Sequence, residues 1–206
     1  MPSLDFVEDR SHSHGFDKIA AILALITTLA LFGAAWQRFG PASDLEPPAL
    51  GALAPPLHLR DPSTAEPIAL LGLRGKVVWL TFFSAAPPNG PAVLNDLEPY
   101  WNRLKTHSLF ALAALAVDHD HPEFLRAALA AAKSTLPTYI ATPETLQAFG
   151  ASPKHLPLHI LIDPSGQVAF VAQGQDRATL SRLAAQALLW LDDLHPPRHF
   201  ASLPAP

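Results

Sequence analysis

The feature that most constrains the fold is a short, unbroken apolar run, VVWLTFF, at Val77–Phe83. It is rich in β-branched and aromatic residues and is bounded by Gly75 and a Pro-rich loop. A run of this length and composition indicates a strand that is buried on both faces, as in the parallel sheets of α/β proteins. We therefore expect its large side chains, Trp79, Phe82 and Phe83, to lie in the core.

Beyond this strand the apolar pattern changes period several times. We expect helices at 92–106, 122–132 and from Asp176 to 194, a helical turn at 143–149, strands at 109–117, 158–162 and 167–172, and a short segment at 138–141. The alanines of 109–117 also permit a helix. The order predicts one α/β domain with a mixed sheet, parallel where helices cross over and antiparallel at the DPSG turn, 163–166.

A second apolar run lies near the start of the chain. It extends from Ile19 to Trp36 without a charged residue, and as a helix it would span about 27 Å, close to the ~30 Å hydrocarbon layer of a membrane. The alternatives are a cleaved signal peptide, for which residues 33–35 supply small side chains, and a buried core helix. We expect an uncleaved membrane anchor, with the bulk of the chain outside the cytoplasm because Arg10 and Lys18 precede the run.

These patterns divide the chain into five parts. We expect a polar leader at 1–18, a transmembrane anchor at 19–37, a Pro-rich tether at 38–53, the α/β domain at 54–194 and a Pro-rich tail at 195–206. A merely disordered connector at 38–53 would have the same composition. The predicted location is a bacterial-type inner membrane, crossed once, with the domain on the periplasmic or extracytoplasmic side.

Composition removes several classes of function. The chain has no cysteine among its 206 residues, which excludes structural disulfides, cysteine-ligated zinc, iron–sulfur clusters and thiol catalysis. Its formal net charge is −4 without a basic run, so nucleic acid is not an expected partner.

Three segments together carry a family resemblance. They are APPLHLRDPSTAEPIALLGLRGKVVWLTFF at 54–83, VDHDH at 117–121 and LPLHILIDPSGQV at 156–168. In this order, with a Pro-Pro turn after the first and a helix at the end, the chain closely resembles the membrane-anchored thioredoxin-like proteins of the TlpA/ResA type over residues 53–191. The resemblance implies a thioredoxin-like fold, and the anchor and tether also fit it.

Members of that family carry a Cys-Pro-Pro-Cys motif between the first buried strand and the next helix, facing a cis-proline. The resemblance puts Ala86, Pro87, Pro88 and Asn89 at the motif, and Pro157 at the cis-proline. Since both cysteines are replaced, we expect no thiol–disulfide oxidoreductase activity and no catalytic residue. What remains is a groove at Asn89, Leu156 and Pro157 that could still bind an extended peptide. Alternatively, the prolines only begin the helix, with Asn89 as its N-cap.

Histidines are the other candidate chemistry. The DHDH stretch follows the second buried strand, at the sheet edge where α/β proteins place ligands. Asp118, His119 and His121, with His159 as a further candidate, could converge there and would suit zinc or copper(II). Alternatively, Asp118 and the following aspartate cap the next helix.

Two classes of function remain open from the sequence. The favoured hypothesis is a redox-inactive, membrane-tethered thioredoxin-fold protein that needs no cofactor and binds a protein partner as an accessory or assembly subunit of a membrane complex. The alternative is a metal-binding or metal-delivery protein that uses the histidine-bearing edge.

Overall fold

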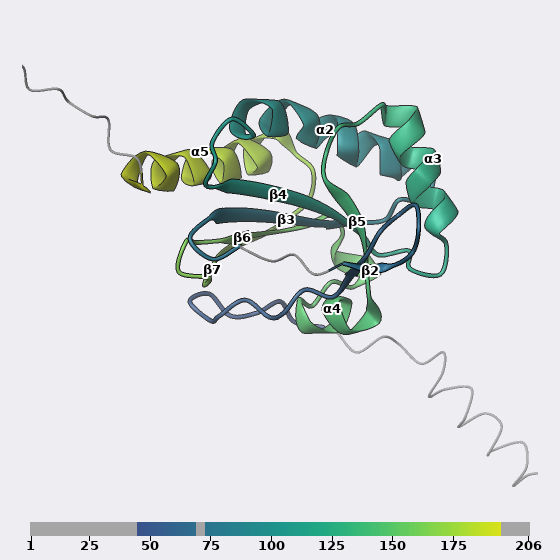
Figure 1. The fold of residues 1–206 in the computed structure, drawn as a ribbon, viewed down its shortest axis with the longest axis horizontal. Helices are drawn as coiled ribbons and strands as arrows, with labels where there is room; N and C mark the ends of the chain where they lie inside the picture. Colours follow the sequence, from purple (N-terminus) through teal and green to yellow (C-terminus); the bar gives the residue numbers. More distant parts are fainter. Residues whose placement is uncertain (1–44, 69–72, 195–206) are drawn as a thin grey trace, which may run out of the picture. The chain divides into compact units, whose positions relative to one another are not determined.

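A mixed sheet in the order β2-β1-β5-β4-β3-β6-β7 forms the centre of the fold (Figure 1). The computed structural model describes residues 45–68 and 73–194. Within these residues the elements are β1 (Leu59–Arg60), β2 (Pro67–Ile68), β3 (Val77–Phe83), α2 (Asn89–Leu104), β4 (Phe110–Ala116), α3 (Pro122–Ala132), β5 (Thr138–Ala141), α4 (Pro143–Ala148), a 3-10 turn η1 (Pro153–His155), β6 (Leu158–Ile162), β7 (Val168–Gln173) and α5 (Arg177–Leu194).

The predicted mixed sheet is confirmed. Strand β3 pairs in parallel with β4 and antiparallel with β6, β4 pairs in parallel with β5, and β6 and β7 form the antiparallel hairpin at the DPSG turn. All seven residues of β3 are buried. The alanine-rich segment after α2 is a strand because it lies between β3 and β5 with both faces covered, where small side chains fit.

Two hydrophobic clusters lie on opposite faces of this sheet. Helices α2, α3 and α5 cover one face, on which Trp79 and Phe83 are fully buried. On the other face, Phe82 packs against Phe149 at the end of α4, with ring centroids 5.4 Å apart. The predicted core residues of β3 are therefore confirmed. The apolar stripe of α5 is also buried, as predicted, at Leu180, Leu183, Ala184, Ala187 and Leu191.

Helix α2 begins at Asn89, three residues before the predicted start at 92. Pro91 is compatible with this earlier start, because it lies in the first turn, where a backbone N–H has no acceptor within the helix. The second proline in this helix, Pro99, stands in its interior. The start of the helix approaches the preceding loop so closely that position 90 needs a glycine. A Cβ there would lie 2.7 Å from the carbonyl carbon and 2.8 Å from the Cα of Ala85.

The sequence patterns missed a hairpin at the edge of the sheet. Strands β1 and β2 have two residues each and pair antiparallel, with β1 also bonded to β5. Two residues are too few to show the alternation that identifies a strand. The turn between them is fixed by Asp61, whose carboxylate accepts hydrogen bonds from the N–H groups of Ser63 and Thr64 at 2.7 and 3.0 Å.

Part of the segment predicted as a tether belongs to the folded domain instead. The Gly51 N–H donates to the Val168 carbonyl at 2.7 Å, and the Val168 N–H donates to Ala52 at 2.8 Å. Leu53 forms a bridge with Gln167. Residues 51–54 thus lie along the outer side of β7, whose pairing with β6 is interrupted by a bulge at Ala169. Backbone pairing of this kind leaves no hydrophobic periodicity in the sequence.

The predicted leader, membrane anchor and tail lie outside the described residues. No helix among residues 45–68 and 73–194 is long and apolar enough to cross a membrane.

We expect Gly90→Ala to lower the free energy of unfolding by about 2 kcal/mol, because the added methyl group would overlap the backbone of Ala85. Ala92→Ser, at an exposed position of the same helix, serves as the control and should cost only a few tenths of that. Urea unfolding of both variants measures the difference. Equal effects would show that the helix start is not closely packed on the loop before it.

Candidate functional site

A cavity of about 490 Å³ opens at the carboxyl ends of β3 and β4. Asn89, Leu156 and Pro157, which the sequence predicts as a peptide-binding groove, all line it. The remaining lining residues come from the ends of the two strands, from α2, from η1 and from the loop before α5: Phe83, Ser84, Val93, Val117, Asp118, Pro153 and Gln175. The structure thus brings the three predicted groove residues to one site.

The Ala86-Pro87-Pro88-Asn89 segment forms one wall of this groove. The N–H of Ala86 donates to the Ser84 hydroxyl at 3.3 Å, and its carbonyl accepts from the N–H of Gly90 at 3.2 Å. Pro88, not Asn89, occupies the N-cap position, so the prediction of Asn89 as N-cap is wrong. Pro88 already has helical backbone angles (φ −89°, ψ −6°), which moves Asn89 into the first turn and leaves its side chain exposed at the cavity.

The opposite wall contains the loop before β6. The Leu156–Pro157 peptide bond is cis, as the family resemblance implies, and so is Pro87–Pro88, which was not expected. Leu156 has an extended backbone (φ −88°, ψ 148°) and both residues are half-buried. An extended, partly exposed backbone at a groove wall is suited to pairing with a peptide strand.

Asp118 joins the two strand ends beneath the groove. Its Oδ1 accepts a hydrogen bond from the Ser84 hydroxyl at 3.0 Å, and its Oδ2 accepts from the N–H of Ala85 at 2.5 Å. Ala85 is almost fully buried, so its N–H depends on this carboxylate. The prediction that Asp118 caps the next helix is therefore wrong, because the N-cap position of α3 belongs to His121.

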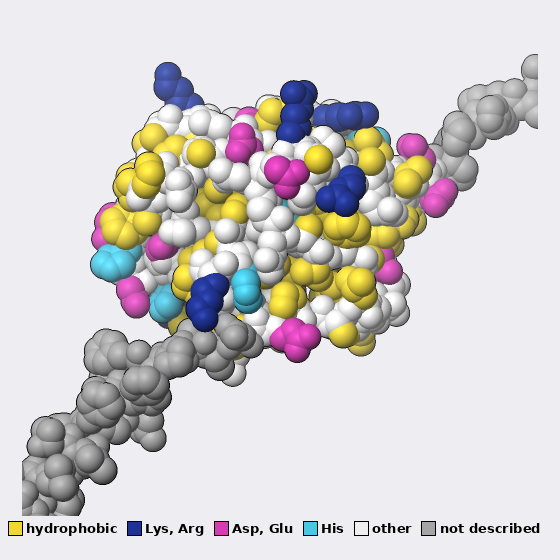
Figure 2. Space-filling model, turned by 180° about the vertical axis from the view of Figure 1, so that it is seen from behind, with side chains coloured by type: hydrophobic (Ala, Val, Ile, Leu, Met, Phe, Trp, Pro, Cys, Tyr) yellow, Lys and Arg dark blue, Asp and Glu magenta, His cyan; other side chains and the backbone are white. Residues whose placement is uncertain are grey.

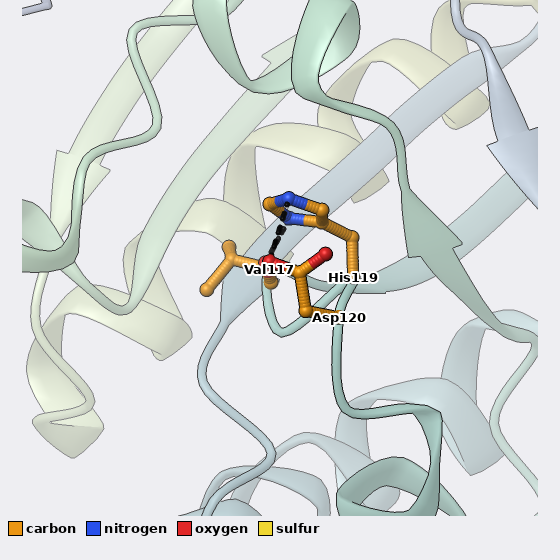
Figure 3. Close-up of polar contacts among 3 residues, drawn as sticks. All are labelled: Val117, His119 and Asp120. Atoms are coloured by element: carbon orange, nitrogen blue, oxygen red, sulfur yellow. Dashed lines mark hydrogen bonds and ion pairs between the residues drawn. The ribbon is translucent and has the colours of Figure 1, made fainter. Parts of the chain in front are cut away.

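Each histidine of the DHDH stretch contacts residues that are close to it in the sequence. The Nδ1 of His119 lies 3.1 Å from the carbonyl oxygen of Val117, and its Nε2 lies 3.4 Å from the Asp120 carboxylate (Figure 3). His121 contacts Glu123 at 3.0 Å, and its ring stacks on Phe124.

The metal group predicted from Asp118, His119, His121 and His159 is not formed in this structure. Within residues 45–68 and 73–194, no three His, Cys, Asp or Glu side chains gather in a way that could hold a metal ion. Adjacent residues of a tight turn project in different directions, so closeness in sequence did not bring these side chains together. Each of them has a hydrogen-bond partner of its own.

His159 is instead a buried link between three segments. Its Nδ1 lies 2.9 Å from the hydroxyl of Thr81 on β3, and its Nε2 lies 3.0 Å from the carbonyl of Gly174. Because a carbonyl can only accept, Nε2 carries the proton and Nδ1 accepts from Thr81. Burial lowers the pKa of His159 from 6.5 to about 4, against the opposing effects of the Gly174 carbonyl and of Asp176.

The same link fixes the groove. The N–H of Gly174 donates to the carbonyl of Pro157 at 2.9 Å, so Gly174 is held by the proline loop through its nitrogen and by His159 through its oxygen. Gln175, the next residue, lines the cavity. Sequence reasoning missed Ser84, Thr81 and Gln175. Ser84 and Asp118 each follow a buried strand, so the position of Asp118 was a usable sequence signal for Ser84. The sequence has no comparable signal for Gln175.

Comparison with known proteins establishes the fold. No family model matches the chain, and no curated protein matches it. A candidate protein disulfide isomerase of Bacteroides thetaiotaomicron has a similar structure, with 21% identity over 71% of this chain and 92% of that chain and a TM-score of 0.60. A thiol:disulfide interchange protein of the thioredoxin family from Chlorobium tepidum is 23% identical over 68% and 99% of the two chains, with a TM-score of 0.56.

A third similar structure is BsSco, described as a member of the Sco family of cytochrome c oxidase assembly proteins. It is 16% identical over 71% of this chain and 96% of that chain, with a TM-score of 0.53. At these identities the similarity shows a thioredoxin-like fold and nothing finer.

The contacts of Asp118 predict that Asp118→Ala will lower the free energy of unfolding by about 2 kcal/mol, because it leaves a buried N–H without an acceptor. Asp120→Ala is the matched control. The Asp120 side chain is 81% exposed and is within ion-pair distance of His119, its one partner among the described residues, so its loss should change little. Chemical denaturation of both variants measures the two changes in the free energy of unfolding. A small change at both positions would contradict a bridging role for Asp118.

The low pKa of His159 predicts a pH-dependent stability. The unfolded chain takes up a proton near pH 6.5, whereas the folded chain resists it until about pH 4. The stability contributed by the neutral imidazole is therefore complete above pH 6.5, and about 3 kcal/mol of it is lost as the pH falls to 4.

The matched control for this effect is His159→Gln, which cannot titrate in this range. The free energy of unfolding of the unsubstituted protein should fall by about 3 kcal/mol relative to that of His159→Gln between pH 7 and pH 4. Parallel curves would show that His159 titrates normally in the folded protein.

Proposed function

We propose that the chain is a redox-inactive thioredoxin-fold protein that binds a protein partner as an accessory or assembly subunit of a membrane complex. In this proposal residues 19–37 anchor the chain in a bacterial-type inner membrane, and the folded domain works on the extracytoplasmic side. The groove at Asn89, Leu156 and Pro157 holds an extended segment of the partner.

The observation that carries this proposal is a groove of about 490 Å³ whose walls are held in place without sulfur. Thiol–disulfide exchange needs a thiolate to attack and a second sulfur to resolve the mixed disulfide. The chain has no cysteine, and Ala86 and Asn89 have neither a thiol nor another nucleophile of comparable strength. The loop nevertheless keeps a defined shape through Asp118, Ser84 and Ala85.

Binding without chemistry fits the physical character of the groove. Its walls combine an extended backbone at Leu156 with apolar side chains such as Phe83 and Val93 and the amide of Asn89. A partner strand would gain main-chain hydrogen bonds from the first and side-chain contacts from the others. A metal-binding role lacks such support, because the candidate ligands among the described residues are dispersed.

The names of the structural neighbours are consistent with two parts of the proposal, an interaction with other proteins and a role in assembly. The fold recurs in thiol:disulfide interchange proteins. It also recurs in BsSco, described as a cytochrome c oxidase assembly protein. The charge-free run from Ile19 to Trp36 supports the membrane location, since its length as a helix matches a bilayer.

Site-specific photo-crosslinking tests the proposal. A photo-reactive amino acid is placed at Asn89, which is exposed in the groove, or at Glu66, which is exposed on the sheet edge. Irradiation of native membranes that contain the full chain should join one partner protein to position 89 and not to position 66, because only the groove holds the partner. Absence of any protein adduct at 89, or the same adducts at both positions, would refute the proposal.

A further inference from the structure

A second cavity, of about 420 Å³, lies between α2 and α5. Most of the residues that line it have polar side chains. Helix α2 contributes Asn95, Asp96, Tyr100 and Arg103, and α5 contributes Arg177 and Ser181. The hydroxyls of Tyr100 and Ser181 lie 3.1 Å apart and link the two helices at this cavity.

Two arginines at this cavity lack a partner among residues 45–68 and 73–194. Neither Arg103 nor Arg177 forms an ion pair or a side-chain hydrogen bond with another residue of the described part of the chain. They come from different helices and line the same space, so their guanidinium groups can act on one ligand. Guanidinium groups pair with carboxylates through two parallel hydrogen bonds, a geometry that lysine cannot provide.

The two arginines outnumber the one acidic side chain, Asp96, among the described residues that line the cavity, which favours an anion there. Arg177 is the first residue of α5, where the helix dipole adds positive potential. The carboxylate of Asp176 accepts a hydrogen bond from the Thr179 N–H at 2.9 Å. Among the described residues, Asp96 is the one acidic side chain that lines the cavity, and it precedes Arg103 by two helical turns, about 10 Å along α2. In the view of Figure 2, most Lys and Arg side chains lie toward the upper edge, on the side of the helical layer.

The second cavity adjoins the groove. Gln175 lines both of them, and it follows Gly174, which is held by Pro157 and His159. An extended chain advances about 3.3 Å per residue. A peptide that lies against the proline loop therefore needs only a few residues beyond Gln175 to enter the arginine-lined cavity.

We propose that the segment bound in the groove carries an Asp or Glu side chain, which is held between Arg103 and Arg177. This inference deepens the proposed function and depends on it. The groove supplies contacts that any extended peptide can make, whereas the arginine pair selects for an acidic residue at one fixed position along the peptide. Since the whole chain has a net charge of −4, the attraction is local and does not extend to acidic proteins in general.

Selection from a random dodecapeptide display library tests this on the purified full chain in detergent. Peptides selected by the unsubstituted protein should be enriched in Asp or Glu at one fixed position. The double variant Arg103→Glu/Arg177→Glu should select Lys or Arg at that position. The control Arg182→Glu reverses a charge on α5 outside the cavity and should leave the acidic preference intact.

Affinities of a selected peptide complete the test. Replacement of its acidic residue by Gln or Asn, as appropriate, should raise Kd about tenfold for the unsubstituted protein, the equivalent of about 1.4 kcal/mol, and should change it little for Arg103→Gln/Arg177→Gln. Peptides that bind in the groove without an acidic preference would overturn this inference and leave the proposed function intact. A library that yields no binding peptide would contradict both.

Discussion

The groove depends on one buried imidazole that must remain neutral. His159 accepts from Thr81 on β3 and donates to Gly174 before α5, and Gly174 in turn donates to Pro157. Three segments that are distant in sequence are thereby held at fixed separations. A protonated imidazole would place two donors where the site offers one acceptor and one hydroxyl, in surroundings that cannot solvate the charge. The shape of the groove and the protonation state of this side chain are consequently inseparable.

A second set of hydrogen bonds explains how the loop keeps its form without cysteine. In the resembling family the segment between the first buried strand and the next helix carries two sulfurs. Here Asp118 bonds Ser84 and Ala85 at the start of that segment, and Gly90 packs on Ala85 where the helix begins. None of these contacts involves Ala86 or Asn89, the positions that the resemblance assigns to the two cysteines of that family. The loop is therefore held from its two ends.

The sequence was informative where a pattern repeats and uninformative where one residue decides. The buried strands and the apolar stripe of α5 could be predicted from the pattern of apolar residues. The order of the elements correctly predicted a sheet with both parallel and antiparallel pairs. The hairpin of β1 and β2 is too short for any period. The histidines near Asp118 suggested a metal because sequence spacing carries no information on where side chains of a tight turn point. Gln175 acquires its place only through Gly174, whose hydrogen bonds are set by tertiary structure.

Both margins of the sheet are unsuited to the addition of another strand. At one margin β2 has only two residues and begins with Pro67, which lacks an N–H. At the other, residues 51–54 lie beside the start of β7, and the bulge at Ala169 interrupts its regular pairing with β6. Within the part of the chain that the structure describes, crowded copies of the domain thus have no flat, open strand through which to polymerise into a continuous sheet.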